Sequence, residues 1–287
     1  MQTSLAEEKR AGTSLQGKPQ TNIAWYVLLL LFSLTFFVRA QSNEPIQLTF
    51  GWELQDASKV TESGQAISQN NYVVSGWLPA TVPGTILTSL VNDGIYPEPL
   101  YGTNNYQIPD SLSHADWWYR TTFIVPESFA GKHVWLNFDG INYIAEVWVN
   151  GSMVGTVRGA FARGIFDVTT NVVADQQAAL AVHILPEPHP GEPHPRTVAT
   201  GMGHNGGITA MDGPTFLCSI GWDWIPSIRD RDIGIWQAVS LSASGPVVLQ
   251  DPFVTSDLPL PRTDSADLTV QTTLHNDTDS PQNGILS

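Results

Sequence analysis

The segment Gly221-Trp222-Asp223-Trp224 sets one carboxylate between two indole rings. Indole faces stack on apolar C–H surfaces of sugar rings, and a carboxylate accepts hydrogen bonds from hydroxyl groups. These residue types therefore suit carbohydrate binding. The structural alternative places both tryptophans in a core, with Asp223 capping a turn or pairing with Arg229 or Arg231. In an extended segment Trp222 and Trp224 point one way and Asp223 the other, so indoles packed inward leave Asp223 facing outward.

The rest of the chain predicts short strands separated by turns. Apolar residues make up 42% of the 287 residues, and 24 glycines and 20 prolines supply turn positions. Runs of apolar and β-branched residues between such turns are typical of a β-sandwich or jelly roll. The predicted strands span 48–54, 117–125, 134–138, 144–149, 153–157, 166–168, 179–185 and 235–241, with two more at 246–254 and 267–274.

Local signals refine this prediction. Asn150-Gly151 between two apolar runs is a strong hairpin signal. A short helix is expected from Ile86 to Val91, stopped at Asp93-Gly94. We expect 48–244 to form one antiparallel two-sheet domain whose core includes the following residues: Trp52, Phe123, Val134, Leu136, Val147 and Val149.

Four blocks carry a family resemblance: TVPGTILTSLVNDGIYPEPLYGTNN, DWWYRTTF, FDGINYIAEVWVNGSMVG and GWDWIPSIRDRDIGIWQAVSL. In this order, over roughly residues 48–244, they resemble the N-terminal sugar-binding domain of glycoside hydrolase family 2. The similarity is greatest to the branch of β-mannosidases, endo-β-mannosidases and exo-β-glucosaminidases. It implies an all-β, galactose-binding-like jelly roll, then an immunoglobulin-like sandwich and a (β/α)₈ catalytic barrel. It also implies that Trp222, Asp223 and Trp224 contribute to the glycone subsite, where Asp223 binds a sugar hydroxyl.

Three regions are predicted. Residues 1–40 are interpreted as a signal peptide, because Lys9, Arg10 and Lys18 precede the nearly apolar run 23–38, and Val38-Arg39-Ala40 offers a cleavage site before Gln41. The run is shorter than the ~20 residues of a membrane span, so membrane attachment is expected only if the signal is not cleaved. Residues 41–245 form the jelly roll, and 246–287 the incomplete start of the immunoglobulin-like domain. The mature protein is expected to be secreted or periplasmic.

No catalytic residue is assigned. Retaining glycosidases place two carboxyls about 5–5.5 Å apart, and in the family both are glutamates on a barrel that takes about 250 residues. Such a barrel does not fit here, so the chain alone is expected to be inactive. Asp139 is interpreted as a turn residue and Glu146 as a solvated strand residue.

The segment 186–215 is predicted to be a long loop at a pocket rim. It repeats Glu-Pro-His-Pro at 187–190 and 192–195, which we interpret as a solvated loop rather than a metal site. Gly201 to Gly206 spells G-x-G-x-x-G without the strand and helix that a dinucleotide site needs. No cofactor and no metal are therefore predicted.

Charge and cysteine content narrow the partners. A formal net charge of −14 disfavours nucleic acid, and the single Cys218, interpreted as a buried thiol, allows no internal disulfide. Two functions remain open: part of a secreted glycoside hydrolase acting on β-linked mannosyl or glucosaminyl carbohydrate, or a non-catalytic carbohydrate-binding or adhesion module. The predicted second sandwich favours the hydrolase. The sugar, the linkage, exo or endo action and the oligomeric state stay open.

Overall fold

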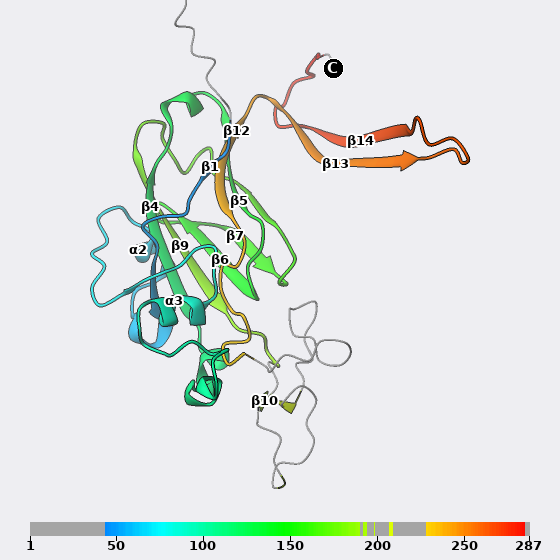
Figure 1. Ribbon diagram of the computed structural model, residues 1–287. Helices are drawn as coiled ribbons and strands as arrows, with labels where there is room; N and C mark the ends of the chain where they lie inside the picture. The colour runs from blue at the N-terminus through cyan, green and yellow to red at the C-terminus, as the bar shows by residue number, and fades with distance from the viewer. Residues whose placement is uncertain (1–43, 190–191, 194–197, 199–206, 209–227, 285–287) are drawn as a thin grey trace, which may run out of the picture. The chain divides into compact units, whose positions relative to one another are not determined.

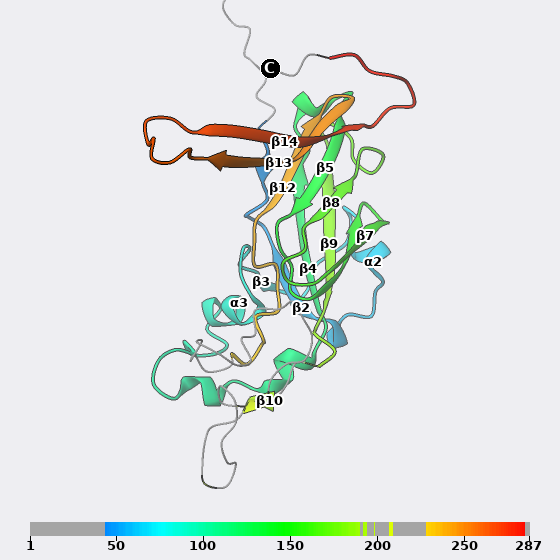
Figure 2. The ribbon, with the colours of Figure 1, turned by 90° about the vertical axis from the view of Figure 1, so that its right-hand side faces the viewer.

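Two antiparallel sheets form the body of the protein (Figures 1 and 2). The computed structural model describes residues 44–189, 192–193, 198, 207–208 and 228–284. One sheet has four strands in the order β1-β12-β5-β8, and the other has six in the order β3-β2-β4-β9-β6-β7. The apolar faces of the two sheets enclose the core, so the predicted all-β jelly-roll class is confirmed.

The elements of the two sheets follow one another along the chain. The strands are β1 (Ile46–Gln47), β2 (Glu53–Asp56), β3 (Leu78–Pro79), β4 (Trp117–Ile124), β5 (His133–Phe138), β6 (Ile144–Val149), β7 (Ser152–Arg158), β8 (Gly164–Asp167), β9 (Gln177–Leu185) and β12 (Val239–Ser244). Two further pairs are β10 (Glu192–Pro193) with β11 (Gly207–Ile208), and β13 (Val247–Asp257) with β14 (Asp267–Asn276).

Helices are few and short. The α-helices are α2 (Gly64–Ile67) and α3 (Ile86–Asn92), and 3-10 turns span η1 (Ala57–Lys59), η2 (Asn104–Gln107), η3 (Asp110–His114) and η4 (Glu127–Phe129). The predicted helix is α3: Thr85 caps its N-terminus by accepting from the Thr88 amide. Among the described residues, neither α-helix has the length and apolar character of a membrane span.

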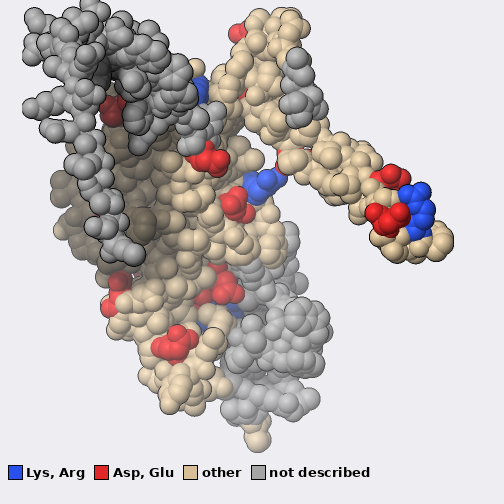
Figure 3. All heavy atoms as spheres, turned by 45° about the horizontal axis from the view of Figure 1, so that its top comes forward, with Lys and Arg blue, Asp and Glu red and all other residues tan. Residues whose placement is uncertain are grey.

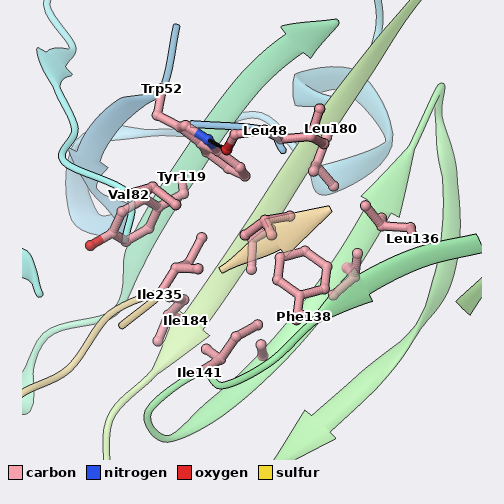
Figure 4. Packing of buried hydrophobic residues seen from close by; sticks show 14 of the residues in the cluster. Leu48, Trp52, Val82, Tyr119, Leu136, Phe138, Ile141, Leu180, Ile184 and Ile235 are labelled. Atoms are coloured by element: carbon pink, nitrogen blue, oxygen red, sulfur yellow. Dashed lines mark hydrogen bonds between the residues drawn. The ribbon is translucent and has the colours of Figure 1, made fainter. Parts of the chain in front are cut away.

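Aromatic and aliphatic side chains from both sheets interlock in the core (Figure 4). The Trp52 indole N–H is satisfied there by the Leu48 carbonyl at 2.7 Å, which lets a large ring be buried without an unpaired donor. Of the core residues predicted from sequence, Trp52, Val134, Leu136, Val147 and Val149 are buried, and Phe123 packs against the core while partly exposed.

The predicted hairpin is present between β6 and β7. Asn150 and Gly151 both adopt positive φ, 46° and 85°, as a two-residue turn of this kind requires. The Asn150 side chain also donates to the Asn171 carbonyl at 2.7 Å and accepts from the Ala179 amide at 2.9 Å. The turn residue therefore also anchors a neighbouring loop.

Several predicted strands differ in their bounds by up to three residues, and two were wrong by more. Of the expected strand 48–54 only the last two residues are in a strand, β2, because Gly51 at φ 71° turns the chain from the first sheet, where β1 pairs with β12, into the second, where β2 pairs with β4. The expected strand 235–241 begins only at Val239. Before that point the Ile235 carbonyl accepts from Gly84 instead of from a strand.

The strands predicted after Gly245 pair as the hairpin β13–β14, interrupted by a register shift between Gln250 and Phe253. Most of its apolar side chains are exposed, among them Leu249, Phe253 and Val270. Figure 3 shows acidic side chains spread over one face of the molecule and not gathered into a single patch.

Candidate functional site

Among the described residues, the two least exposed charged side chains are those of Asp230 and Arg231, in the turn that precedes β12. Asp230 has no exposed surface. Its carboxylate accepts from the Leu87 amide in the first turn of α3 at 2.7 Å and from the Asp232 amide at 2.9 Å. Burial raises the pKa of Asp230, and these backbone hydrogen bonds oppose the rise. Asp230 thus joins the turn to α3, more than a hundred residues earlier.

Asn142 holds the same turn from the other side. Its side-chain amide donates to the carbonyls of Arg231 at 2.9 Å and Asp232 at 3.0 Å. Its backbone exchanges two hydrogen bonds with Gly234, both 2.9 Å. Gly234 adopts φ +146°, and a Cβ there meets the Gly84 carbonyl oxygen at 2.7 Å, so the close approach needs glycine.

Arg231 lies almost wholly inside the protein, at 1% exposed. Its Nη1 donates to the Ile228 carbonyl at 3.1 Å. Burial lowers the pKa of the guanidinium, while the negative charges of Asp110 and Glu187 oppose that change. The side chain therefore interacts with Asp110 of η3 and with Glu187 and Ile228, which lie in the long connection between β9 and β12.

Glu187 corrects part of the loop prediction. The first Glu-Pro-His-Pro copy was expected to be solvated, but Glu187 is only 2% exposed. The attraction of its carboxylate to buried Arg231 gives the physical reason. His194 lies outside the described residues, and so do Gly201 to Gly206 and Cys218, so the predictions made on them are untested.

Asp232 is the last of the four residues 229–232, which we call the charged turn. Arg231 and Asp232 both have left-handed backbones, with φ of 55° and 57°, a conformation that aspartate tolerates better than most residues. Burial, followed by the negative charge of Asp230, raises the pKa of Asp232 to about 7, against the opposing charge of Arg231. This carboxylate changes its charge near neutral pH.

The predicted sugar-binding residues Trp222, Asp223 and Trp224 lie outside the described residues. The structure describes the chain again from Ile228, four positions after Trp224, and that end is held by Arg231. Of the two predicted alternative partners of Asp223, Arg229 donates from Nε to the Asn105 carbonyl at 3.1 Å. Sequence reasoning missed the roles of Asp230 and Asn142. The one signal was the alternating run Arg229-Asp230-Arg231-Asp232, which shows charge but not its partners.

The outer face of the six-stranded sheet carries a second polar cluster. The His183 ring stacks on Trp118, with centroids 4.4 Å apart. Its two nitrogens lie 3.6 Å from carboxylate oxygens of Asp116 and Glu146. Glu146 was predicted to be simply solvated; its side chain is 39% exposed and pairs with His183 across neighbouring strands. Within the described ranges, no group of three or more histidine, cysteine or acidic residues is placed to hold a metal ion.

The two antiparallel sheets form a β-sandwich of the galactose-binding-like class that occurs in glycosidases. Residues 52–237 match the family described as "Glycosyl hydrolase 2 galactose-binding domain-like". The chain belongs to this family, which confirms the resemblance seen in its sequence.

Individual relatives agree with this assignment. The chain is 32% identical to an exo-β-D-glucosaminidase of Streptomyces avermitilis over 234 residues, 80% of this chain and 23% of the relative. It is 39% identical to a mannosylglycoprotein endo-β-mannosidase of Lilium longiflorum over 186 residues, 63% and 19% of the two chains. The solved exo-chitosanase of Amycolatopsis orientalis superposes with a TM-score of 0.63 at 28% identity, covering 82% of this chain and 25% of that one. The chain thus spans about a quarter or less of the length of these relatives.

Proposed function

We propose that this chain supplies the sugar-binding jelly roll of a secreted glycoside hydrolase that acts on β-glucosaminides or β-mannosides. The match of residues 52–237 to the glycosidase domain family carries the proposal. Relatives named exo-β-D-glucosaminidase and endo-β-mannosidase support the substrate class. In this function Trp222, Asp223 and Trp224 form part of the pocket for the terminal sugar.

The chain that follows the predicted pocket segment is held by several contacts. Asp230, Asn142 and Arg231 tie the turn after Ile228 to α3, to the start of β6 and to η3. A segment that is anchored at one end loses less conformational entropy when its side chains are ordered around a ligand. The indoles supply apolar faces, and Asp223 accepts hydrogen bonds from sugar hydroxyls.

The test is Asp223→Asn in the full-length enzyme, assayed on aryl β-glucosaminide and aryl β-mannoside. A charge-assisted hydrogen bond contributes ~1.5–3 kcal/mol, so kcat/KM is expected to fall by roughly one to two orders of magnitude. The melting temperature should stay close to that of the wild type, because Asn keeps the size of the side chain.

The matched control is Asp139→Asn, the same chemical change at an exposed position, and it should leave the kinetics unchanged. Unchanged kinetics with a lowered melting temperature in Asp223→Asn would retire the pocket role and leave Asp223 as a structural residue. Absence of turnover of both substrates by the full-length protein would favour a non-catalytic carbohydrate-binding module. The chain by itself, residues 41–287, is expected to turn over neither substrate.

A further inference from the structure

A cavity of about 250 Å³ opens between the first turns of α3, the segment Glu98–Leu100 and the charged turn at Ile228 and Asp232. Its volume lies below the roughly 300–1,000 Å³ typical of sites for drug-sized ligands. A single sugar ring is therefore a better match to the cavity than an oligosaccharide. The walls combine carboxylates and threonine hydroxyls with aliphatic side chains such as Val91.

Asp232 distinguishes this cavity from an ordinary surface hollow. Its side chain is partly buried and lines the cavity. Asp230, two positions earlier, is satisfied by two backbone amides, whereas no donor among the described residues hydrogen-bonds to the Asp232 carboxylate. A partly desolvated carboxylate without a protein donor is unfavourable unless water, a proton, a cation or a ligand donor reaches it.

The electrostatic surroundings favour a positively charged ligand. Asp230 lies close enough to Asp232 to raise its pKa, and Arg231 only partly offsets this effect. Glu98 adds a second carboxylate at the exposed rim, where one of its oxygens accepts from the Leu100 amide at 3.2 Å. An ammonium group at Asp232 offsets the negative charge of Asp230 and donates hydrogen bonds to the Asp232 carboxylate.

We propose that this cavity binds one amino sugar unit of the glucosamine class, with its ammonium group on Asp232, a second contact to Glu98 and its C–H face against Val91 and Leu100. The choice of sugar rests on the proposed function, because the relatives include enzymes named for β-glucosaminides. The site itself is built only from described residues of this chain. It gives the jelly roll a means of selecting aminated over neutral sugars.

The experiment titrates the purified chain at pH 7 with glucosamine, and separately with glucose and N-acetylglucosamine, using calorimetry and ligand-observed NMR. Glucosamine should bind saturably. Glucose lacks the amine and N-acetylglucosamine lacks its charge, so both should bind at least tenfold more weakly. Asp232→Asn should weaken glucosamine binding at least tenfold, and Glu98→Gln two- to fivefold.

Glu127→Gln, a neutralised carboxylate at an exposed position elsewhere, controls for net charge and should bind like the wild type. Circular dichroism on each variant establishes that it is folded. If Asp232→Asn does not fold, Glu98→Gln still tests the proposal. Equal binding of glucose and glucosamine, no saturable binding, or no effect of either variant overturns the proposal. This experiment measures binding and not turnover, so the two proposals can fail separately. Glucosamine binding through Asp232 would stand even if the full-length enzyme cleaved no glucosaminide.

Discussion

Replacing Arg231 with methionine tests whether the buried guanidinium holds the base of the long connection. The residue is 1% exposed, donates to the Ile228 carbonyl at 3.1 Å, and is attracted by the negative charges of Asp110 and Glu187. Methionine keeps the length of the side chain but removes the positive charge that attracts Asp110 and Glu187. Removing one member of a buried ion pair typically costs ~3–5 kcal/mol. Since 1 kcal/mol shifts the melting temperature of a 150–250-residue domain by about 2–4 °C, the expected fall is roughly 6–20 °C.

Urea unfolding at pH 7, followed by tryptophan fluorescence, measures the free energy of unfolding of each variant. Arg231→Lys keeps the charge without the planar fork, so it should lose only ~1–2 kcal/mol. Both substitutions meet the same left-handed backbone at φ 55°, so the conformational cost of that position largely cancels. Glu187→Gln combined with Arg231→Met should recover part of the loss, because the uncompensated charge at Glu187 is removed.

The reasoning on Arg231 is refuted if Arg231→Met loses less than about 1 kcal/mol, since a buried pair in which one partner is removed costs more than this. It is equally refuted if the double-mutant cycle with Glu187→Gln gives no coupling energy, because two residues that attract each other are not additive.

Three further results are expected. Burial raises the pKa of the Asp232 carboxyl from its ordinary 3.8 to about 7 in the folded protein, so its contribution to stability is greatest below pH 3.8 and is lost as the pH rises to about 7. Asp232→Asn should therefore match the wild type at pH 4 and be up to about 4 kcal/mol more stable at pH 8. A stability difference that stays constant across this range contradicts the assignment. Gly234→Ala places a Cβ 2.7 Å from the Gly84 oxygen and should cost more than ~3 kcal/mol, whereas Gly245→Ala, with nothing within 4 Å, should be nearly neutral; equal melting temperatures for the two would contradict the close approach. Protein exported from a secretion-competent host should begin at or near Gln41 by intact mass, and retention of residues 1–40 would count against a cleaved signal.

Local patterns were sufficient for elements whose partners are close in sequence or whose faces differ clearly. The hairpin β6–β7 follows from Asn150-Gly151, and β5 shows the strict alternation of buried and partly exposed residues that a sandwich strand requires. The helix α3 follows from its apolar face and its Thr85 cap. These signals lie within a few residues of the feature that they predict.

Elements held by distant contacts were missed. The helix α2 has no side-chain cap at Ser63, and its sequence contains no strong start signal. Its last turn is held instead by Arg120 of β4, which donates to the Ile67 carbonyl at 2.9 Å and the Gln69 carbonyl at 3.0 Å. A tertiary contact across more than fifty residues replaces the local cap, and no window of sequence shows it.

At the candidate site, the environments of the charged turn could not be predicted for the same reason. As a sequence, Arg229 to Asp232 is a run of alternating charge, which is usually a solvated surface. In the structure the four side chains have four different environments: Arg229 donates to η2, Asp230 accepts from α3, Arg231 faces two carboxylates and Asp232 lines a cavity. Neither charge nor spacing distinguishes Asp230 from Asp232, because each environment is supplied by a segment far away in the sequence. The run therefore connects parts of the domain that the sequence separates, and it begins five positions after Trp224, the last residue of the predicted sugar-binding segment.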